Sequence, residues 1–287
     1  MNNNYVIITD TGCDIAPEIL KQWGVCAADL KFRIDGEDKD YTNAEISSAD
    51  FYARMRDGAS AKTSAVNAEQ FKDMFRPVLE QGTDVLYLGF SSGLSATYQS
   101  SVMAVEDLRE EFPDRKIFAV DTLCASSGQG LLVRLALDKK NEGASIEDVA
   151  RFVEDNRLHL CHWFTVDDLV YLKRGGRVSP AVAFVGGMLG IKPVLHVDDE
   201  GHLINRGKVR GRKASLESLV NHYVELATGE GPIYICHADC MDDVELLKGM
   251  LREKAGVEVD RVCDIGAVIG SHSGPGTIAL FFLGKKR

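Results

Sequence analysis

The chain has 287 residues, of which 45% are hydrophobic and 26% are charged, and its 33 basic and 43 acidic side chains give a net charge of −10. A chain of this length usually divides into two lobes, and the composition is that of an ordinary globular protein. The acidic balance argues against nucleic acid as a partner, because contacts to phosphates require a basic surface.

The seven cysteines are scattered and odd in number, which argues against a disulfide framework. Cys236, His237 and Cys240 come closest to a metal site, but they lack a fourth ligand and the spacing of a zinc finger. We therefore expect neither a metal nor a cofactor. The opening MNNNYVIITD contains no basic segment and no long apolar core, so we expect no signal peptide and a cytoplasmic location.

Short β-rich runs alternate with helical patterns in the first half of the chain. Strands are predicted at 5–10, 84–90 and 116–122, and helices at 16–23, 51–57, 68–82, 94–112, 128–140 and 146–157. This alternation is typical of a parallel sheet with crossover helices. Binding loops in such sheets lie at the carboxyl ends of the strands, where Asp10, residues 91–95 and Asp121 are expected.

The pattern changes near residue 160. Turn signals at Gly175-Gly176 and at 199–201 separate short strands in a hairpin arrangement. A helix at 215–227, a strand at 232–238, a helix at 242–255 and strands at 262–270 and 277–283 follow. We predict an N-terminal parallel-sheet α/β domain, residues 1–160, and a second α/β domain with hairpins, residues 161–287.

Residues 265–284 carry no formal charge over a length that could cross a membrane. Ser271, His272, Ser273 and Pro275 occupy the middle of this stretch, between glycines. Two short strands around a polar loop fit that pattern better than a helix in lipid. We expect no stable membrane insertion.

The stretch GFSSG, residues 89–93, matches G-x-S-x-G, the nucleophile elbow of an α/β-hydrolase. His272 follows in the order that such an enzyme would need. An oxyanion segment is missing upstream, and hairpin signals replace the further parallel strands of that fold. A serine hydrolase of acyl esters that uses Ser91 and His272 is therefore the alternative.

The same stretch is also a hydroxyl-rich turn that opens a helix near Gly93. Ser92 and Ser95 would then occupy the N-cap and N3 positions. The free N–H groups and the positive end of the helix dipole favour an anionic oxygen there, and Gly93 lets a ligand approach the backbone closely. Four serines within 91–100 exceed what a helix cap needs. An anion site is the favoured interpretation.

These residues also carry a resemblance, since FSSGLSATYQS is similar to the SSxLSGTYQSA segment of the DegV family of bacterial fatty-acid-binding proteins. Further motifs follow in the order of that family: VIITDTGCDI, KTSAVNAEQF, VDTLCASSGQGLLV, YLKRGGRVS, GIKPVLHVDDEGHL, RGRKA and GSHSGPG. The chain departs from the family at Gly12-Cys13, at 65–67 and at Ala96, which preserves helix propensity. The resemblance implies a two-lobed DegV-like α/β fold with the carboxylate-binding loops in the N-terminal domain.

The resemblance also implies a ligand, one long-chain, hexadecanoate-like fatty acid with its carboxylate held by hydroxyl groups. By motif position Thr63 and Ser95 would bind the carboxylate, supported by Ser92, His272 and an arginine of KRGGR, Arg177. Hydrogen bonds are needed there, because a buried carboxylate is otherwise costly. The apolar runs AFVGGMLG, residues 183–190, and IALFFL, residues 278–283, could line the tail.

In the best-understood, FakB-like members, the bound acid is presented to a separate fatty-acid kinase that forms an acyl-phosphate for phospholipid synthesis. This chain has no phosphate-binding loop of its own, so the resemblance implies a binding and presenting protein. If 203–210 forms a strand, Arg206, Lys208, Arg210 and Arg212 alternate onto one face. We predict that Arg206, Arg210 and Arg212 dock the kinase. The alternative is a charged strand edge that prevents aggregation.

Overall fold

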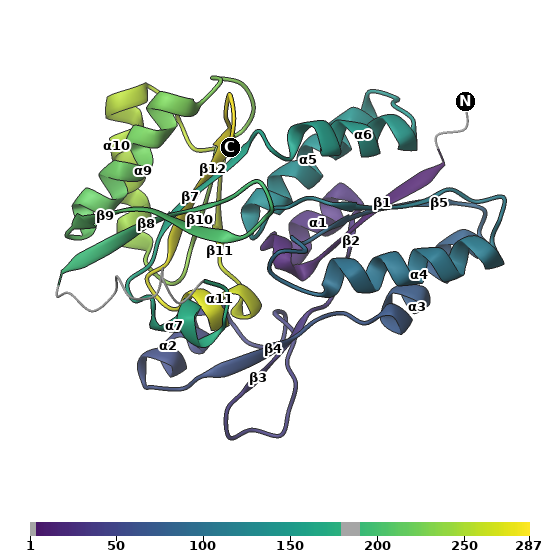
Figure 1. The fold of residues 1–287 in the computed structure, drawn as a ribbon, viewed down its shortest axis with the longest axis horizontal. Helices are drawn as coiled ribbons and strands as arrows, with labels where there is room; N and C mark the ends of the chain where they lie inside the picture. The colour runs from purple at the N-terminus through teal and green to yellow at the C-terminus, as the bar shows by residue number, and fades with distance from the viewer. Residues whose placement is uncertain (1–3, 179–189) are drawn as a thin grey trace.

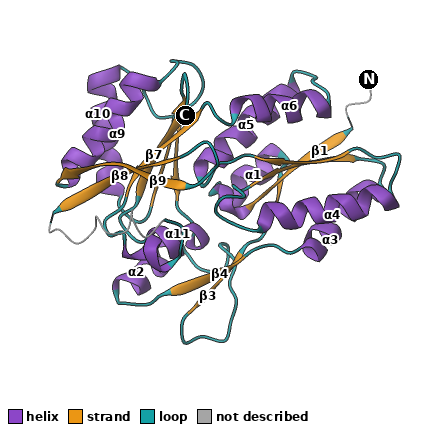
Figure 2. Ribbon diagram, in the orientation of Figure 1, coloured by secondary structure: helices purple, strands orange, loops and turns teal. Residues whose placement is uncertain are grey.

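The computed structural model describes residues 4–178 and 190–287, which form two sheets flanked by helices, with a smaller arm beside them (Figures 1 and 2). The first sheet has four parallel strands in the order β2-β1-β5-β6. Its strands are β1 (Tyr5–Asp10), β2 (Cys26–Ala28), β5 (Asp84–Gly89) and β6 (Ile117–Asp121). The predicted parallel sheet is confirmed.

Helices pack on both faces of this sheet, so that its central strands are almost wholly buried. Figure 1 shows α5 and α6 on one side and α3 and α4 on the other. The elements of this domain are a short 3₁₀ turn η1 (Thr11–Cys13), α1 (Pro17–Trp23), α3 (Ala68–Glu80), α4 (Thr97–Glu111), α5 (Ser127–Asn141) and α6 (Ile146–Asn156).

The second sheet is mixed, with the strand order β11-β10-β12-β7-β8-β9. Its strands are β7 (Leu160–Thr165), β8 (Ile191–Val197), β9 (Leu203–Arg210), β10 (Tyr234–His237), β11 (Arg261–Asp264) and β12 (Ile278–Leu283). Helices α9 (Arg212–Leu226) and α10 (Met241–Ala255) bury leucines and valines against one face of this sheet. The predicted β8–β9 hairpin is present, with its turn at 198–202.

The strands of the first sheet all precede residue 122, and those of the second begin at Leu160. The division predicted between residues 160 and 161 lies at the beginning of β7 and stays a prediction. In the described part of the chain, no helix is both long and apolar enough to cross a bilayer.

An arm between β2 and α3 was predicted only as a helix. It consists of β3 (Lys31–Ile34), α2 (Ser48–Arg56) and β4 (Ala61–Ser64), with β3 and β4 paired antiparallel. Phe32, Phe51 and Tyr52 anchor the arm, and the buried Tyr52 hydroxyl donates to the Ile265 carbonyl at 2.8 Å. The arm therefore packs against the second domain, although it belongs to the first in sequence.

Two helices lie where strands or turns were predicted, α7 (Val170–Arg174) and α11 (Ala267–Ser273). The strand predicted at 262–270 is therefore present only in its first part, as β11, and His272 lies in a helix and not in the predicted loop. Side chains of the first domain cap α11: the N–H of Gly266 donates to Asp14 and that of Val268 to Asn43. Because these caps come from distant residues, the local pattern could not reveal the helix.

Candidate functional site

A cavity of about 310 Å³ lies between the two domains and is bounded on one side by α11. Phe90 and Leu94 of the first domain and Phe164, Val197 and Phe281 of the second contribute to its apolar walls. Thr63, Ser95, Arg177 and His272 also line it. The structure thus brings together four of the five predicted carboxylate ligands in one cavity.

The centre of the polar group is a hydrogen bond of 2.7 Å between Thr63 Oγ1, on β4, and His272 Nε2, on α11. The other ring nitrogen, Nδ1, is buried without a hydrogen-bond partner. It faces Gly175, where an added Cβ would lie 2.2 Å away. If the imidazole carries its proton on Nε2, it donates to Thr63, and the threonine hydroxyl is then free to donate into the cavity.

Burial, and then the nearby charge of Arg177, lower the pKa of His272 to about 4. The imidazole is therefore neutral at pH 7. Burial also lowers the pKa of Arg177, which nevertheless keeps its charge. Its Nε donates to the Leu94 carbonyl at 3.2 Å and its Nη1 to the Gly175 carbonyl at 2.5 Å, so the guanidinium is held against the cavity.

Ser95 lines the cavity, but not as the predicted N3 residue. Helix α4 begins at Thr97, and Ala96 is its N-cap. The Ser95 hydroxyl accepts the N–H of Thr97 at 3.2 Å and lies 2.9 Å from the Thr97 hydroxyl. Ser92, the predicted N-cap, is exposed and lines neither described cavity. The predicted helix start near Gly93 is therefore wrong by about one turn.

The buried Ser91 packs the loop before α4 against the β8–β9 turn. Its hydroxyl donates to the Gly201 carbonyl at 2.9 Å, and an added Cβ at Gly93 would meet the same turn at 2.9 Å. Gly93 therefore admits protein backbone, not a ligand as predicted. Since Ser91 bonds to a carbonyl and His272 to Thr63, the two side chains are not paired as the hydrolase interpretation requires.

The sequence analysis missed several residues of the cavity, and it treated Gly175, which lies against His272, only as a turn signal. Ser126, His162 and Cys236 also line the cavity. The run 183–190, predicted to line the tail, lies outside the described residues except at its last position, and in the other predicted run Ala279 and Phe281 do line the cavity. Across the described ranges 4–178 and 190–287, no group of three or more His, Cys, Asp or Glu side chains is arranged to hold a metal ion.

The basic residues of β9 do not share one face as predicted. Pro193 pairs with Lys208 and Val194 with Gly207, but Leu195 pairs with Asn205, so Arg206 is an extra residue in a β-bulge. Before the bulge, Ile204 pairs with His196, on the α9 side of the sheet. Arg206 also points to the α9 side. Burial is the largest cause of the lowered pKa of His196 and of His222, and the charge of Arg206 lowers both pKa values further. Lys208 and Arg210 lie on the opposite side.

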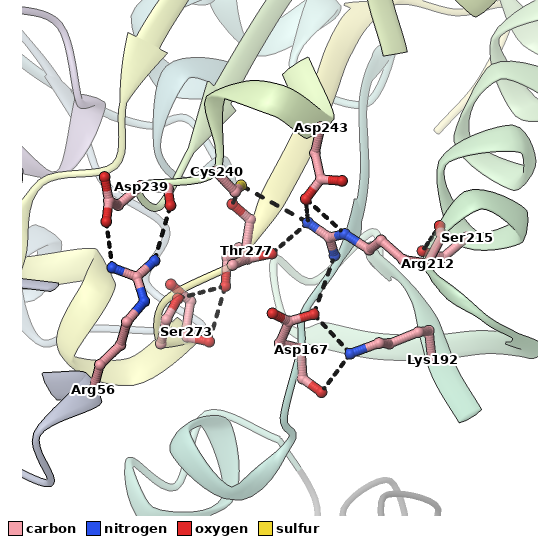
Figure 3. Close-up of polar contacts among 12 residues, drawn as sticks. Arg56, Asp167, Lys192, Arg212, Ser215, Asp239, Cys240, Asp243, Ser273 and Thr277 are labelled. Carbon is pink, nitrogen blue, oxygen red and sulfur yellow. Dashed lines mark hydrogen bonds and ion pairs between the residues drawn. The ribbon is translucent and has the colours of Figure 1, made fainter. Parts of the chain in front are cut away.

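Arg212 begins α9 and is not free for docking, because its guanidinium lies in a partly buried ion-pair network (Figure 3). It bonds Asp243 at 2.9 Å and the Gly276 carbonyl at 2.6 Å, and it lies 3.7 Å from Asp167, which also pairs with Lys192. Arg212 therefore ties α9 to α10 and to the loop before β12.

The fold and the cavity define a two-lobed α/β protein with an interdomain pocket, largely apolar, that contains hydroxyls, an imidazole and a guanidinium. The family model described as "Uncharacterised protein, DegV family" matches residues 4–285, and the chain belongs to the DegV family. A DegV domain-containing protein of Clostridium perfringens is 44% identical over 286 residues, which cover 99% of this chain and 98% of the relative.

Solved structures give the same result. A DegV family protein from Thermus thermophilus, whose structure is described by its fatty-acid binding, has a TM-score of 0.86 at 33% identity over 97% of this chain and 98% of its own. A stearic-acid-binding protein from Eubacterium ventriosum has a TM-score of 0.87 at 27% identity, over 98% of each chain. The predicted DegV-like fold is confirmed.

The low pKa of His272 predicts a loss of stability in acid. The unfolded imidazole takes up a proton near pH 6.5, whereas the folded one does so only near pH 4. Its contribution is therefore present above pH 6.5 and is lost as the pH falls toward 4. When the pH is lowered from 7 to 5, the free energy of unfolding should fall in both proteins. The fall should be about 2 kcal/mol smaller in His272→Gln than in the unsubstituted protein. Urea unfolding at both pH values tests this, with the exposed His202→Gln as control; equal losses in all three proteins would contradict it.

The ion-pair network predicts that Arg212→Ala lowers the free energy of unfolding by about 2–3 kcal/mol, because Asp243 and the Gly276 carbonyl lose a charged donor. Urea unfolding measures this effect. Arg210→Ala is the matched control, since Arg210 is exposed and forms no ion pair within the described residues; it should change stability by less than about 0.5 kcal/mol. Similar effects of the two substitutions would show that the network does not stabilise the fold.

Proposed function

We propose that this protein binds one long-chain fatty acid, hexadecanoate-like in length, in the interdomain cavity. The proposal rests on one observation: a single cavity combines apolar walls with a polar group of four side chains, those of Thr63, Ser95, Arg177 and His272. A fatty acid has the same two parts. The fatty-acid-binding descriptions of the Thermus and Eubacterium proteins, which share the fold over nearly the whole chain, support it.

The polar group has the chemistry that a buried carboxylate needs. Thr63 and Ser95 offer hydroxyl donors, and Arg177 offers a positive charge that is already partly desolvated. The neutral His272 holds the Thr63 hydroxyl in place without adding a second buried charge. Together these groups offset the several kcal/mol that a carboxylate loses when it leaves water.

The tail supplies the driving force for binding. Each methylene buried against the phenylalanine, leucine and valine side chains of the cavity contributes about 0.8 kcal/mol. A short carboxylic acid would satisfy the polar group but would gain little from the walls. We therefore expect the protein to bind long-chain acids in preference to small carboxylates. It also makes the protein a lipid-binding protein and assigns no catalytic role to Ser91.

We expect Thr63→Val and Ser95→Ala each to weaken fatty-acid binding by about 1.5–3 kcal/mol, because each removes one hydrogen bond to a charged group. Titration with a fluorescent fatty acid measures the affinity. Ser92→Ala is the matched control, since this serine lies in the same loop but outside the cavity. Wild-type affinity in both cavity variants, or an equal loss in the control, would refute the proposed carboxylate site.

We also propose that the bound acid is presented to a fatty-acid kinase, in the cytoplasm, where the phosphoryl donor of such an enzyme is found. The support comes from the family resemblance and from the exposed cations of β9. Lys208 and Arg210 lie on one side of the edge strand and have no ion pair in the described part of the chain. Two adjacent cations on an acidic protein would steer an acidic surface toward this edge.

Arg210→Ala should therefore slow phosphorylation of the bound acid by the cognate kinase, through slower association, and the defect should shrink as salt rises. Fatty-acid affinity should stay unchanged. Arg206→Ala should have the smaller effect, because the bulge turns Arg206 toward α9. Stopped-flow association at low and high salt separates these outcomes. Full kinase-coupled activity of Arg210→Ala at low salt would reject docking at this edge.

A further inference from the structure

Helix α11 borders the cavity along its length. The lining residues in this helix and just before it recur at helical spacing and so share one face: Ile265, Val268, Ile269, His272 and Ser273. A chain whose carboxylate lies at Thr63 and that follows this face passes from His272 toward Gly266, six residues earlier. Those residues span about 9 Å along the helix axis, which is only part of the length of a long-chain acid. The middle of the chain, and not its end, therefore lies beside the beginning of α11.

Two polar side chains line the cavity near the beginning of α11. The Ser126 hydroxyl lies 2.6 Å from Asp14 Oδ2, and the N–H of Gly266, the N-cap of α11, donates to Oδ1 of the same carboxyl at 2.9 Å. His162 lies close to Ser126, because its Nε2 accepts the N–H of the preceding residue, Ala125. Ser126 and His162 are both buried, and both line the cavity. We expect the middle of a bound chain to pass these two side chains.

The His162 imidazole presents a hydrogen-bond acceptor. Its Nδ1 lies 3.1 Å from the Leu160 carbonyl, which can only accept, so Nδ1 carries the proton and Nε2 has a free lone pair. Burial is the largest cause that lowers the pKa of His162 well below its usual value, so the ring is neutral at pH 7. The Ala125 N–H reaches Nε2 at 3.4 Å, which is longer than usual for such a bond. The protein therefore satisfies Nε2 only weakly.

The Ser126 hydroxyl presents a donor. Asp14, behind it, lines a second cavity of about 900 Å³ between α1 and β11 and contacts a bound chain only through Ser126. Burial, the largest cause, raises the pKa of Asp14 to about 8, so that the carboxyl is mostly protonated at pH 7. Since Oδ1 accepts the Gly266 N–H, the proton lies on Oδ2, and the hydrogen bond can run from the carboxyl to the serine. The serine's own hydrogen is then free to point to the Cys236 thiol, 3.1 Å away, or into the cavity.

A hydroxyl group on the chain matches these two side chains, and a methylene does not. The neighbouring wall is apolar and includes Phe164, Ala279 and Phe281. A methylene beside Ser126 and His162 would exclude water from both without replacing its hydrogen bonds. A chain hydroxyl can donate to His162 Nε2 and accept from Ser126 at the same time, whereas a keto oxygen can only accept.

We propose that Ser126 and His162 recognise a hydroxyl group near the middle of the acyl chain, so that the ligands of this protein include long-chain hydroxy fatty acids. The inference rests on the proposed function and adds to it a class of ligand and the residues that select it. The distance along α11 between the carboxylate site and these two residues sets the position of the hydroxyl group.

The test compares palmitic acids that carry one hydroxyl group at successive positions with palmitic acid itself. Competition with a fluorescent fatty acid gives each affinity, and the ratio to palmitic acid removes effects common to both ligands. In the unsubstituted protein this ratio should peak for a hydroxyl near the middle of the chain, about tenfold above its value for a hydroxyl at the methyl end. The oxo acid of the peak position should bind more weakly than the hydroxy acid, because it cannot donate to His162.

Two variants each remove one partner of the chain hydroxyl. Ser126→Gly deletes the serine hydroxyl and suits the φ of 53° at this position, and His162→Leu deletes the acceptor. Each should lower the peak ratio by about threefold or more, and the affinity for palmitic acid should not fall. Ser127→Ala is the matched control and should keep the peak, since Ser127 is the next serine, is also buried and lines neither cavity. Thermal melts confirm that each variant is folded.

The outcomes separate this inference from the proposed function. A ratio that does not vary with the position of the hydroxyl, while palmitic acid still binds, would overturn the inference and leave fatty-acid binding intact. A peak that survives in both Ser126→Gly and His162→Leu, or that Ser127→Ala also abolishes, would overturn it as well. Equal affinity for the oxo and hydroxy acids would exclude His162 as the acceptor. If the unsubstituted protein binds none of the acids, both proposals fail.

Discussion

The hydrogen bond between Thr63 and His272 joins residues that are 209 positions apart and belong to different domains. Helix α11, which carries His272, is capped at its other end by Asp14 and Asn43 of the first domain. The helix is thus held at both ends by side chains of the other domain, and it forms one wall of the cavity. The site exists only when the two domains are docked.

Docking explains the charge states of the site. His272 is enclosed by the arm, by α7 and by its own helix, and its imidazole is therefore neutral at pH 7. Among the four polar side chains of the cavity, Thr63, Ser95, Arg177 and His272, Arg177 is then the charged one. One positive charge matches one carboxylate. A second buried cation would have raised the cost of the ligand-free state. The hydroxyl groups of Thr63 and Ser95 can orient a carboxylate through hydrogen bonds without adding a charge.

The sequence predicted the parts of the fold whose signals are local. The strand at 84–89 is an apolar run between turn signals, and the helix at 68–80 has its own capping box from Asn67 and Gln70, so both were recognisable. Helix α11 was not, because its caps are more than 200 residues away. Ser92 and Ser95 are chemically identical in the sequence, and the tertiary packing of their loop, including the contact of Ser91 with Gly201, leaves Ser95 and not Ser92 against the cavity. Thr63 and His272 could be paired from motif resemblance alone, since no periodicity connects them.

The bulge at Arg206 shows how little is needed to redirect the electrostatic field of an edge strand. One extra residue between Asn205 and Gly207 rotates every later side chain of β9 by half a turn, so Lys208 and Arg210 point away from α9. Regular pairing of the same residues, without the bulge, would leave the composition and the net charge unchanged. Lys208 would then lie opposite Lys192 and not Pro193, and the two cations would appear on the other surface, so within such a strand the register carries as much information about partners as the identity of the residues.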